Sequence, residues 1–333
     1  MAKNRSLHAA SRAKKDEFYT QLYDIENELR HYRAHFRDKV VYCNCDDPRV
    51  SNFFHYFAYN FRLLRLKKLI TTCYKNQQMD MFSRNDAERA IWLEYTGTEN
   101  ETAIPSLEDI ATHYLQGDGD FRSAECIELL KQADIVVTNP PFSLFREYVA
   151  QLIEYDKKFL ILGNKNAITY KEIFPFIKEN KLWIGNTPMG RDLLFDVPAD
   201  YAEYLVENKK EGSSYKIIDG VVKGRSQSAW FTNLDYRKRH KDLRLYKHYS
   251  PEDYSHYDNY DAINVDKTAE IPMDWDGAMG VPISFLDKHN PDQFEILARM
   301  TTTKIDEFNF GYPYINGKKI YARIIIRNKQ RQA

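Results

Sequence analysis

A stiff polar tetrapeptide follows a short apolar segment near the middle of the 333-residue chain. The segment Asp134 to Thr138 is apolar at its centre, and Asn139, Pro140, Pro141 and Phe142 come directly after it. Consecutive prolines fix φ and lack N–H donors, so this loop presents carbonyl groups rather than amides. The Asn139 side-chain carbonyl and the Pro140 backbone carbonyl can therefore act together as two hydrogen-bond acceptors.

Two such acceptors suit a planar amine as nucleophile. The exocyclic amine of a nucleobase is a poor nucleophile, because its lone pair is delocalised into the ring. Acceptors aimed at both N–H bonds favour a pyramidal nitrogen and stabilise the positive charge of the transition state. Phe142 can stack on a base that has been flipped out of a duplex. The bare tetrapeptide could also be a rigid turn, but its place after an apolar strand favours catalysis.

The surrounding sequence alternates between strand-like and helix-like segments. We expect strands at 39–43, 66–73, 110–115, 134–138, 158–163, 182–185 and 228–232, and helices at 25–36, 51–60, 124–131, 145–155 and 170–180. Residues 75–103 are polar and predict little regular structure. The alternation predicts an α/β fold with a doubly wound, mostly parallel sheet. Because ligands bind at the carboxyl ends of such strands, the polar turns at 44–48, 117–120 and 139–142 should meet at one edge.

The C-terminal third differs in charge. Residues 236–248 are basic and residues 251–276 are acidic. The basic run could contact DNA phosphates, or it could be a solvated face paired with the acidic stretch, and both interpretations stay open. The candidates for phosphate contact are Arg237, Lys238, Arg239, Lys241 and Arg244. Farther on, Asn316-Gly317 predicts a hairpin turn, and residues 320–326 predict a strand.

Bulk composition excludes several classes of protein. The 48 basic and 48 acidic residues balance, so the chain has no general basic coat for nucleic acid. The four cysteines, at 43, 45, 73 and 126, are expected to be reduced and mostly buried. We expect no metal site, because the histidines show no ligand pairing and Gly117 to Asp120 lacks the spacing of a calcium loop. That stretch is either a cofactor contact or a plain turn. The N-terminus lacks the apolar core of a signal peptide, and no apolar run approaches the ~18 residues of a membrane span, which predicts a cytoplasmic protein.

Several longer strings resemble a known family. DIVVTNPPFSLF (Asp134 to Phe145) resembles motif IV of amino-methyltransferases that act on nucleic acids, and DEFYT (Asp16 to Thr20) resembles their motif X. The EcoRI-type adenine-specific modification methylases are similar over nearly the whole chain, apart from 75–110 and 186–227. The strings that carry this resemblance are VVYCNCDDPRVSNFF (Val40 to Phe54), GDGDFRS (Gly117 to Ser123), TNLD (Thr232 to Asp235), YDNYDAINV (Tyr257 to Val265) and MGVPISFL (Met279 to Leu286).

The resemblance implies both fold and partners. It implies the sheet of S-adenosylmethionine-dependent methyltransferases, with S-adenosylmethionine as cofactor and the N6 of adenine in double-stranded DNA as target. GAATTC is a candidate site, and a cognate restriction endonuclease would act on the same site without direct contact. A catalytic domain would span 1–235 with a recognition insertion near 186–227, and 236–333 would be a C-terminal target-recognition region.

The resemblance also assigns roles to residues. Asn139 and Pro140 would accept from the adenine amine within the loop that Pro141 stiffens, and Phe142 would stack on the base. The residues expected at the cofactor are Phe18, Tyr19 and Thr20 beside its methionine part, Cys43, Asn44, Cys45 and Asp46 in the turn after the first strand, and Asp118 or Asp120 with Phe121 at its adenosine end. The first turn lacks the usual Gly-x-Gly, and the second strand ends at Tyr74 without the usual acidic residue.

Two other functions fit parts of this pattern. An Asn-Pro-Pro loop also suits glutamine amides in proteins or adenines in RNA. Glutamine methylases favour Tyr where this chain has Phe142, and they lack this C-terminal region. A DNA-binding protein that has lost catalysis would explain the missing Gly-x-Gly, but the intact Asn139 to Phe142 loop argues against it.

Overall fold

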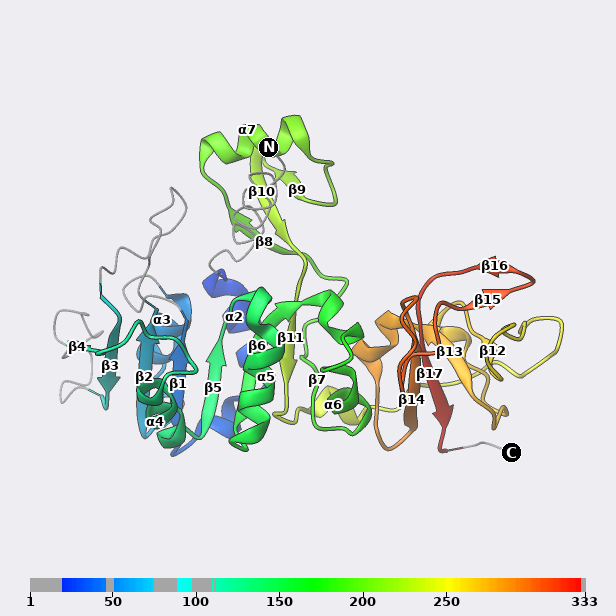
Figure 1. Ribbon diagram of the computed structural model, residues 1–333, viewed down its shortest axis with the longest axis horizontal. Coiled ribbons are helices and arrows are strands. Elements are labelled where there is room, and N and C mark those ends of the chain that lie inside the picture. The colour runs from blue at the N-terminus through cyan, green and yellow to red at the C-terminus, as the bar shows by residue number, and fades with distance from the viewer. Residues whose placement is uncertain (1–19, 46–50, 75–88, 98–109, 111, 331–333) are drawn as a thin grey trace. The chain divides into compact units, whose positions relative to one another are not determined.

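The computed structural model describes residues 20–45, 51–74, 89–97, 110 and 112–330. The chain divides into two compact units, shown in Figure 1. The first comprises Met1–Asn164 and Arg191–Leu234, and the second comprises Lys165–Gly190 and Asp235–Ala333. The segment 165–190 therefore groups with the C-terminal part of the chain rather than with the residues that precede it.

The central sheet of the first unit runs in the order β4-β3-β2-β1-β5-β6-β11. Its strands are β1 (Val40–Asn44), β2 (Lys68–Cys73), β3 (Ile91–Tyr95), β4 (Thr112–Tyr114), β5 (Ile135–Thr138), β6 (Lys158–Asn164) and β11 (Ser228–Thr232). Strands β2, β1, β5 and β6 are parallel, whereas β3, β4 and β11 pair antiparallel. The predicted α/β architecture is confirmed as a mixed sheet with a parallel centre. Every residue of β1 and β5 is buried, as expected for strands covered on both faces.

Helices on the first unit follow the expected positions, with one break. They are α2 (Leu22–Leu29), α3 (Asn52–Tyr59), α4 (Ala124–Gln132) and α5 (Phe145–Glu154), with short 3₁₀ turns η1 (Arg33–Phe36) and η3 (Phe142–Leu144). The prediction of a continuous helix over 25–36 was wrong. Helix α2 ends at Leu29, and the separate 3₁₀ turn η1 begins at Arg33. The apolar face was right, since Ile25, Leu29, Tyr32 and Phe36 are all fully buried.

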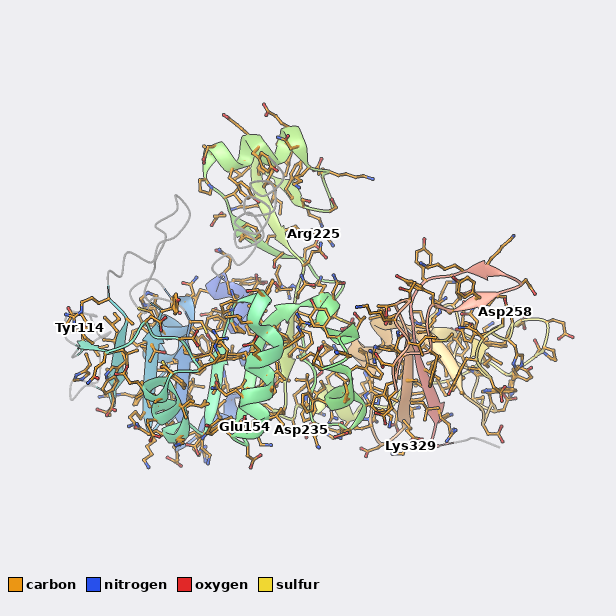
Figure 2. All side chains as sticks on the ribbon, viewed as in Figure 1. Tyr114, Glu154, Arg225, Asp235, Asp258 and Lys329 are labelled. Carbon is orange, nitrogen blue, oxygen red and sulfur yellow. The ribbon has the colours of Figure 1, made fainter. Side chains whose placement is uncertain are left out.

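One strand contradicts the sequence prediction. Residues 91–95, within the stretch expected to be irregular, form β3 and pair with β2. Ile91, Leu93 and Tyr95 are buried on alternate positions, which is the period of a half-buried strand. Strand β4 continues this edge with exposed side chains, among them Tyr114, labelled in Figure 2.

An insertion between β6 and β11 forms a small antiparallel sheet. Its elements are β8 (Leu193–Asp196), α7 (Ala199–Asn208), β9 (Tyr215–Ile218) and β10 (Val221–Ser226), and the strand order is β8-β10-β9. A side chain at Gly224 would collide with the Phe195 ring, since its Cβ would lie 2.2 Å away. The absence of a side chain at Gly224 thus lets Phe195 pack flat on the sheet.

The second unit is built on a four-stranded sheet in the order β12-β13-β17-β14. Its elements are η4 (Lys165–Thr169), α6 (Phe174–Lys178), β7 (Trp183–Ile184), η5 (Arg237–His240), β12 (Ile263–Asn264), η6 (Thr268–Glu270), β13 (Met279–Pro282), η7 (Ile283–Lys288), β14 (Phe294–Met300), β15 (Tyr314–Ile315), β16 (Lys318–Lys319) and β17 (Arg323–Asn328). The Asn-Gly hairpin is confirmed, with φ of 50° at Asn316 and 72° at Gly317 between β15 and β16. The expected helix 170–180 is shorter, and the final strand begins at Arg323.

Candidate active site

The Asn139 to Phe142 loop lies at the carboxyl end of β5, as the sequence predicts. Strand β5 ends at Thr138, and η3 begins at Phe142 and continues directly into α5. The Leu144 amide donates to the Pro141 carbonyl at 2.9 Å, which closes the turn after the prolines. The loop is thus held between a buried strand and a helix.

Asn139 has an unsatisfied acceptor. Its side chain is only 9% exposed, and its Oδ1 has no hydrogen-bond partner among the described residues. Leaving a buried carbonyl unpaired costs about 1–3 kcal/mol. A ligand that donates an N–H to this oxygen would recover that energy.

Asn139 and Phe142 line a pocket of the first unit. The other lining residues are Thr20, Gln21, Asp24, Leu162, Leu193, Leu194, Phe195, Ser226 and Ser228. Thr20, expected at the cofactor, is therefore on the same pocket as Asn139, and its buried Oγ1 also lacks a partner within the described residues. The remaining predicted residues of that segment, Phe18 and Tyr19, lie outside the part of the chain that the structure describes.

Asn44 ties the turn after β1 to the strand and helix that flank the loop. The Thr138 hydroxyl donates to the Asn44 backbone carbonyl, and the Tyr148 hydroxyl donates to Asn44 Oδ1. Tyr148 is fully buried on α5, and burial raises the pKa of its phenol well above the usual value, so it keeps its proton. Asn44 therefore links the turn after β1 to the Asn139 loop, and its side-chain oxygen already accepts a hydrogen bond.

Cys45 adopts a backbone conformation that glycine usually takes. Its φ is +87°, in the left-handed region, and it occupies the turn where the family resemblance predicts a Gly-x-Gly. The turn thus has a glycine-like conformation at a cysteine. Cys43 is buried within β1, and Asp46 falls outside the described residues.

The turn Gly117 to Asp120 lies against the carboxyl end of β2. Gly119 has φ of +82°, and a Cβ there would lie 2.5 Å from the Cys73 carbonyl oxygen. Asp118 accepts from the Asp120 amide at 3.0 Å, and burial, followed by the Asp118 charge, raises the pKa of the Tyr74 phenol. Asp118 therefore brings a carboxylate to the end of a strand that has none of its own.

Asp120 forms an ion pair with Arg122. Arg122 donates to both of its carboxylate oxygens, at 2.9 and 2.7 Å, and these hydrogen bonds lower the pKa of Asp120. Phe121 is buried and meets the Tyr148 ring edge-on, with centroids 5.0 Å apart. The Thr138 hydroxyl brings the end of β5 beside Asn44, and Tyr148 contacts both Asn44 and Phe121, the residue that follows the Gly117 to Asp120 turn.

Sequence reasoning missed Thr138, Tyr148 and the insertion residues that line the pocket. Tyr148 lies on the apolar face of an amphipathic helix, where a tyrosine gives no sign of its hydroxyl partner. Leu193, Phe195 and Ser226 come from a segment that the family strings do not cover. Only the strand-like pattern of those residues could have indicated them.

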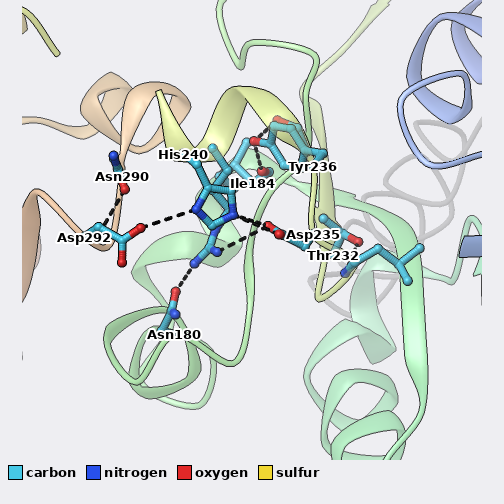
Figure 3. Close-up of polar contacts among 11 residues, drawn as sticks. Asn180, Ile184, Thr232, Asp235, Tyr236, His240, Asn290 and Asp292 are labelled. Atoms are coloured by element: carbon cyan, nitrogen blue, oxygen red, sulfur yellow. Dashed lines mark hydrogen bonds and ion pairs between the residues drawn. The ribbon is translucent and has the colours of Figure 1, made fainter. Parts of the chain in front are cut away.

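The basic run divides into exposed and buried members. Arg237, Lys238, Lys241 and Arg244 are exposed. Arg239 is a correction, because it is only 7% exposed and its guanidinium lies 3.8 Å from the centre of the Trp183 ring. It also donates to Asn180 Oδ1, as Figure 3 shows. Arg239 thus stabilises the second unit and is not available to a phosphate.

His240 joins two carboxylates beside Arg239. Its Nε2 lies 2.8 Å from Asp235 and its Nδ1 lies 3.4 Å from Asp292 (Figure 3). The hydrogen bond to Asp235 raises the pKa of His240. At the end of the run, His248 pairs with Asp274 of the acidic stretch at 2.9 Å. Pairing within the second unit therefore accounts for part of the run, and Lys238 Nζ also donates to the Asn186 carbonyl at 3.0 Å.

The cysteines and the possible metal ligands can be compared with the sequence predictions in the described residues. All four cysteines are free, and Cys43, Cys73 and Cys126 are buried, as predicted. Within the described ranges no cluster of His, Cys, Asp or Glu could hold a metal ion. None of the described helices is both long and apolar enough to cross a membrane.

Known proteins resemble the chain over almost its full length. Residues 6–329 match the family described as adenine-specific methyltransferase EcoRI. The type II methyltransferase M.EcoRI of Escherichia coli is 52% identical, with 99% of this chain and 98% of that protein covered. Type II methyltransferases of Mycoplasma genitalium and Mycoplasma pneumoniae are 39% and 37% identical, each over 97% of this chain and over 99% and 98% of their own lengths. No solved structure gives a significant match.

Proposed function

Because the chain belongs to the EcoRI family of adenine-specific methyltransferases, we propose that its Asn139 to Phe142 loop methylates the N6 of an adenine flipped out of duplex DNA. The chain is an adenine-specific DNA methyltransferase, and the proposal assigns the chemistry to particular atoms. The observation that carries this assignment is the buried Oδ1 of Asn139 on the pocket, which has no hydrogen-bond partner in the part of the chain that the structure describes.

Asn139 and Pro140 act on the nucleophile. The Asn139 Oδ1 accepts one N–H of the adenine amine and the Pro140 carbonyl accepts the other, so the nitrogen becomes pyramidal and its lone pair is directed outward. Neither acceptor is a strong base, so the proton leaves to solvent after the transfer. Phe142, half-buried on the same pocket, stacks on the base and offsets part of the stacking lost on flipping.

The residues around the turns fit S-adenosylmethionine. When bound, this cofactor supplies an electrophilic methyl group on a sulfonium. The Asn44-Cys45 turn, fixed by Thr138 and Tyr148, would hold its central part, because the positive φ of Cys45 gives the backbone the course that a glycine-containing turn takes at this position. Thr20 would lie beside its methionine part, and Asp118 with Phe121 would bind the adenosine end. Asp120 would act mainly by orienting Arg122 and the loop.

Double-stranded DNA is the proposed substrate at GAATTC, within a restriction-modification system. The site is inferred from the 52% identity to the Escherichia coli enzyme. Residues 1–235 would form the catalytic domain with its insertion near 186–227, and 236–333 would contribute to target recognition. Arg237, Lys238, Lys241 and Arg244 are the exposed cations that would contact phosphates. A cognate endonuclease would cut the same site without touching this protein.

Transfer of a labelled methyl group tests the assignment. The parent enzyme should label duplex DNA and leave RNA and protein glutamines unlabelled. Asn139→Ala should reduce kcat by about 100-fold or more, since one transition-state acceptor is lost. Its affinity for the cofactor, measured by calorimetry, should stay within about twofold of the parent. Undiminished transfer by this variant would contradict the assignment, and absence of cofactor binding in the parent would favour a DNA-binding protein without catalysis.

A further inference from the structure

The insertion extends from the catalytic pocket to a hairpin tip. Leu193 and Phe195 of β8 and Ser226 of β10 line the pocket that holds Asn139. From Ser226, strand β10 runs away from the pocket as far as Val221, five residues earlier. At about 3.4 Å per residue, the hairpin tip lies roughly 17 Å along the strand from the pocket lining.

The tip is apolar and exposed. A two-residue turn, Asp219-Gly220 with φ of 50° and 76°, joins β9 to β10. Ile218 and Val221 flank the turn as a cross-strand pair and are 41% and 53% exposed, and Ile217 is 48% exposed. Ile218 and Val221 project from the same face of the tip, whereas Ile217 lies on the other face. An exposed apolar pair at a hairpin tip is a surface suited to contact with another molecule.

The two faces of the insertion carry opposite charges. Helix α7 packs on β10 (Figure 1). Phe195 and Tyr215 both pair with Gly224 and are buried, so they share the covered face of the small sheet. The helix contains three acidic residues and no basic one, namely Asp200, Glu203 and Glu207.

The open face of the small sheet is basic. Side chains alternate along a strand, so Lys216, Lys223 and Arg225 lie opposite the face that α7 covers. Figure 2 labels Arg225 on this sheet. Within the described residues, Lys216 and Arg225 pair with Asp192 and Lys223 pairs with Asp196, so three cations face two carboxylates. The helix thus carries a net negative charge and the open face a net positive one, which favours the open face for contact with phosphates.

We propose that the open face and tip of the β9–β10 hairpin bind the DNA duplex beside the flipped adenine. Lys216 and Lys223 lie along the phosphate backbone, and Ile218 and Val221 contact the base stack. Removing a base from the stack leaves its neighbours exposed, and apolar side chains commonly insert at such steps. A two-stranded ribbon is also narrow enough to enter the major groove. The inference rests on the proposed function, which places the adenine in the pocket at the base of this hairpin.

A double variant of the tip tests the inference. Ile218→Ser with Val221→Ser removes the apolar pair at two exposed positions and leaves the turn intact. Val206→Ser is the matched control, because Val206 is 49% exposed on the acidic helix α7. The probe is a duplex carrying GAATTC, or the site that methylation sequencing assigns, with 2-aminopurine at the target adenine. Binding, the fluorescence rise on flipping, and cofactor affinity are measured for the three proteins.

The tip variant should bind the duplex about tenfold more weakly, as expected for the loss of two half-buried apolar contacts. Its fluorescence rise should be reduced, while its cofactor affinity and the behaviour of Val206→Ser should match the parent. An active parent with a tip variant that binds and flips equally well would overturn this inference alone. Equal losses in the tip variant and the control would overturn it too. A parent that neither binds nor methylates DNA would overturn the proposed function, and this inference with it.

Discussion

Replacing Tyr148 by Phe should weaken cofactor binding without touching any residue that contacts the substrate. The substitution removes the hydroxyl that donates to Asn44 Oδ1 and leaves that oxygen unpaired at a residue only 5% exposed. An unpaired buried acceptor costs about 1–3 kcal/mol. The turn reduces this cost by shifting. Cofactor binding must then return the turn to its original conformation. We expect the affinity for S-adenosylmethionine to fall about tenfold, which is about 1.4 kcal/mol.

Tyr42→Phe is a matched control for this prediction. Tyr42 is equally buried and lies close to the same turn, since Thr72 pairs with Asn44 across β1 and β2. Its hydroxyl shares a hydrogen bond of 2.8 Å with Thr72, so Tyr42→Phe leaves the hydrogen bond from Tyr148 to Asn44 in place. Both variants should lose similar stability in urea unfolding. Calorimetry should detect weaker cofactor binding only in Tyr148→Phe, and kinetics should show a raised KM for the cofactor with kcat within about threefold. Equal cofactor affinity in the two variants would refute the positioning role of Tyr148.

Three further predictions concern other parts of the structure. Cys45→Gly should raise the free energy of unfolding by about 1 kcal/mol, because glycine adopts the positive φ at less cost; a loss of stability in chemical unfolding would contradict this. Burial lowers the pKa of His289 to about 4, so below pH ~6.5 the unfolded chain binds a proton that the folded chain refuses. Stability should therefore decline as pH falls, by up to about 3 kcal/mol at pH ~4, and His289→Gln should flatten this dependence in urea titrations at several pH values. Lys241→Ala should reduce the slope of log affinity for DNA against log salt by about 1, whereas Arg239→Ala should instead lower stability by about 3 kcal/mol. A smaller salt slope with unchanged stability in Arg239→Ala would reverse that distinction.

Apolar periodicity predicted much of the first unit. Ile25, Leu29, Tyr32 and Phe36 are buried as the spacing required, yet the helix breaks between them. Periodicity reports which face is buried, and it does not report whether backbone hydrogen bonding is continuous. Strand β3 was missed although Ile91, Leu93 and Tyr95 alternate, because polar sequence on both sides hid a short signal.

The Asn139 loop could be located from sequence because its chemistry is local. Its four residues are consecutive, and their place after an apolar strand put them at a ligand-binding edge. The partners of Asn44 could not be located in this way. Thr138 and Tyr148 lie 94 and 104 positions from Asn44 along the chain, and only the folded sheet brings them together.

Arg239 illustrates why the basic run was only partly informative. Its neighbours in sequence are exposed, and nothing in the run marks one arginine as buried. Trp183 and Asn180, which hold its guanidinium, come from the segment 165–190 that joins the second unit. A charge pattern identifies a candidate surface, and the fold decides which of its members face outward.

Sequencing that detects N6-methyladenine tests the central claim most directly. DNA would be taken from a methylation-deficient host that expresses either the parent protein or Asn139→Ala. We expect N6-methyladenine at one short motif, the proposed GAATTC, in the parent culture and its near absence with the variant. Equal methylation in both cultures, or none in the parent culture although the protein is folded and binds its cofactor, would contradict it.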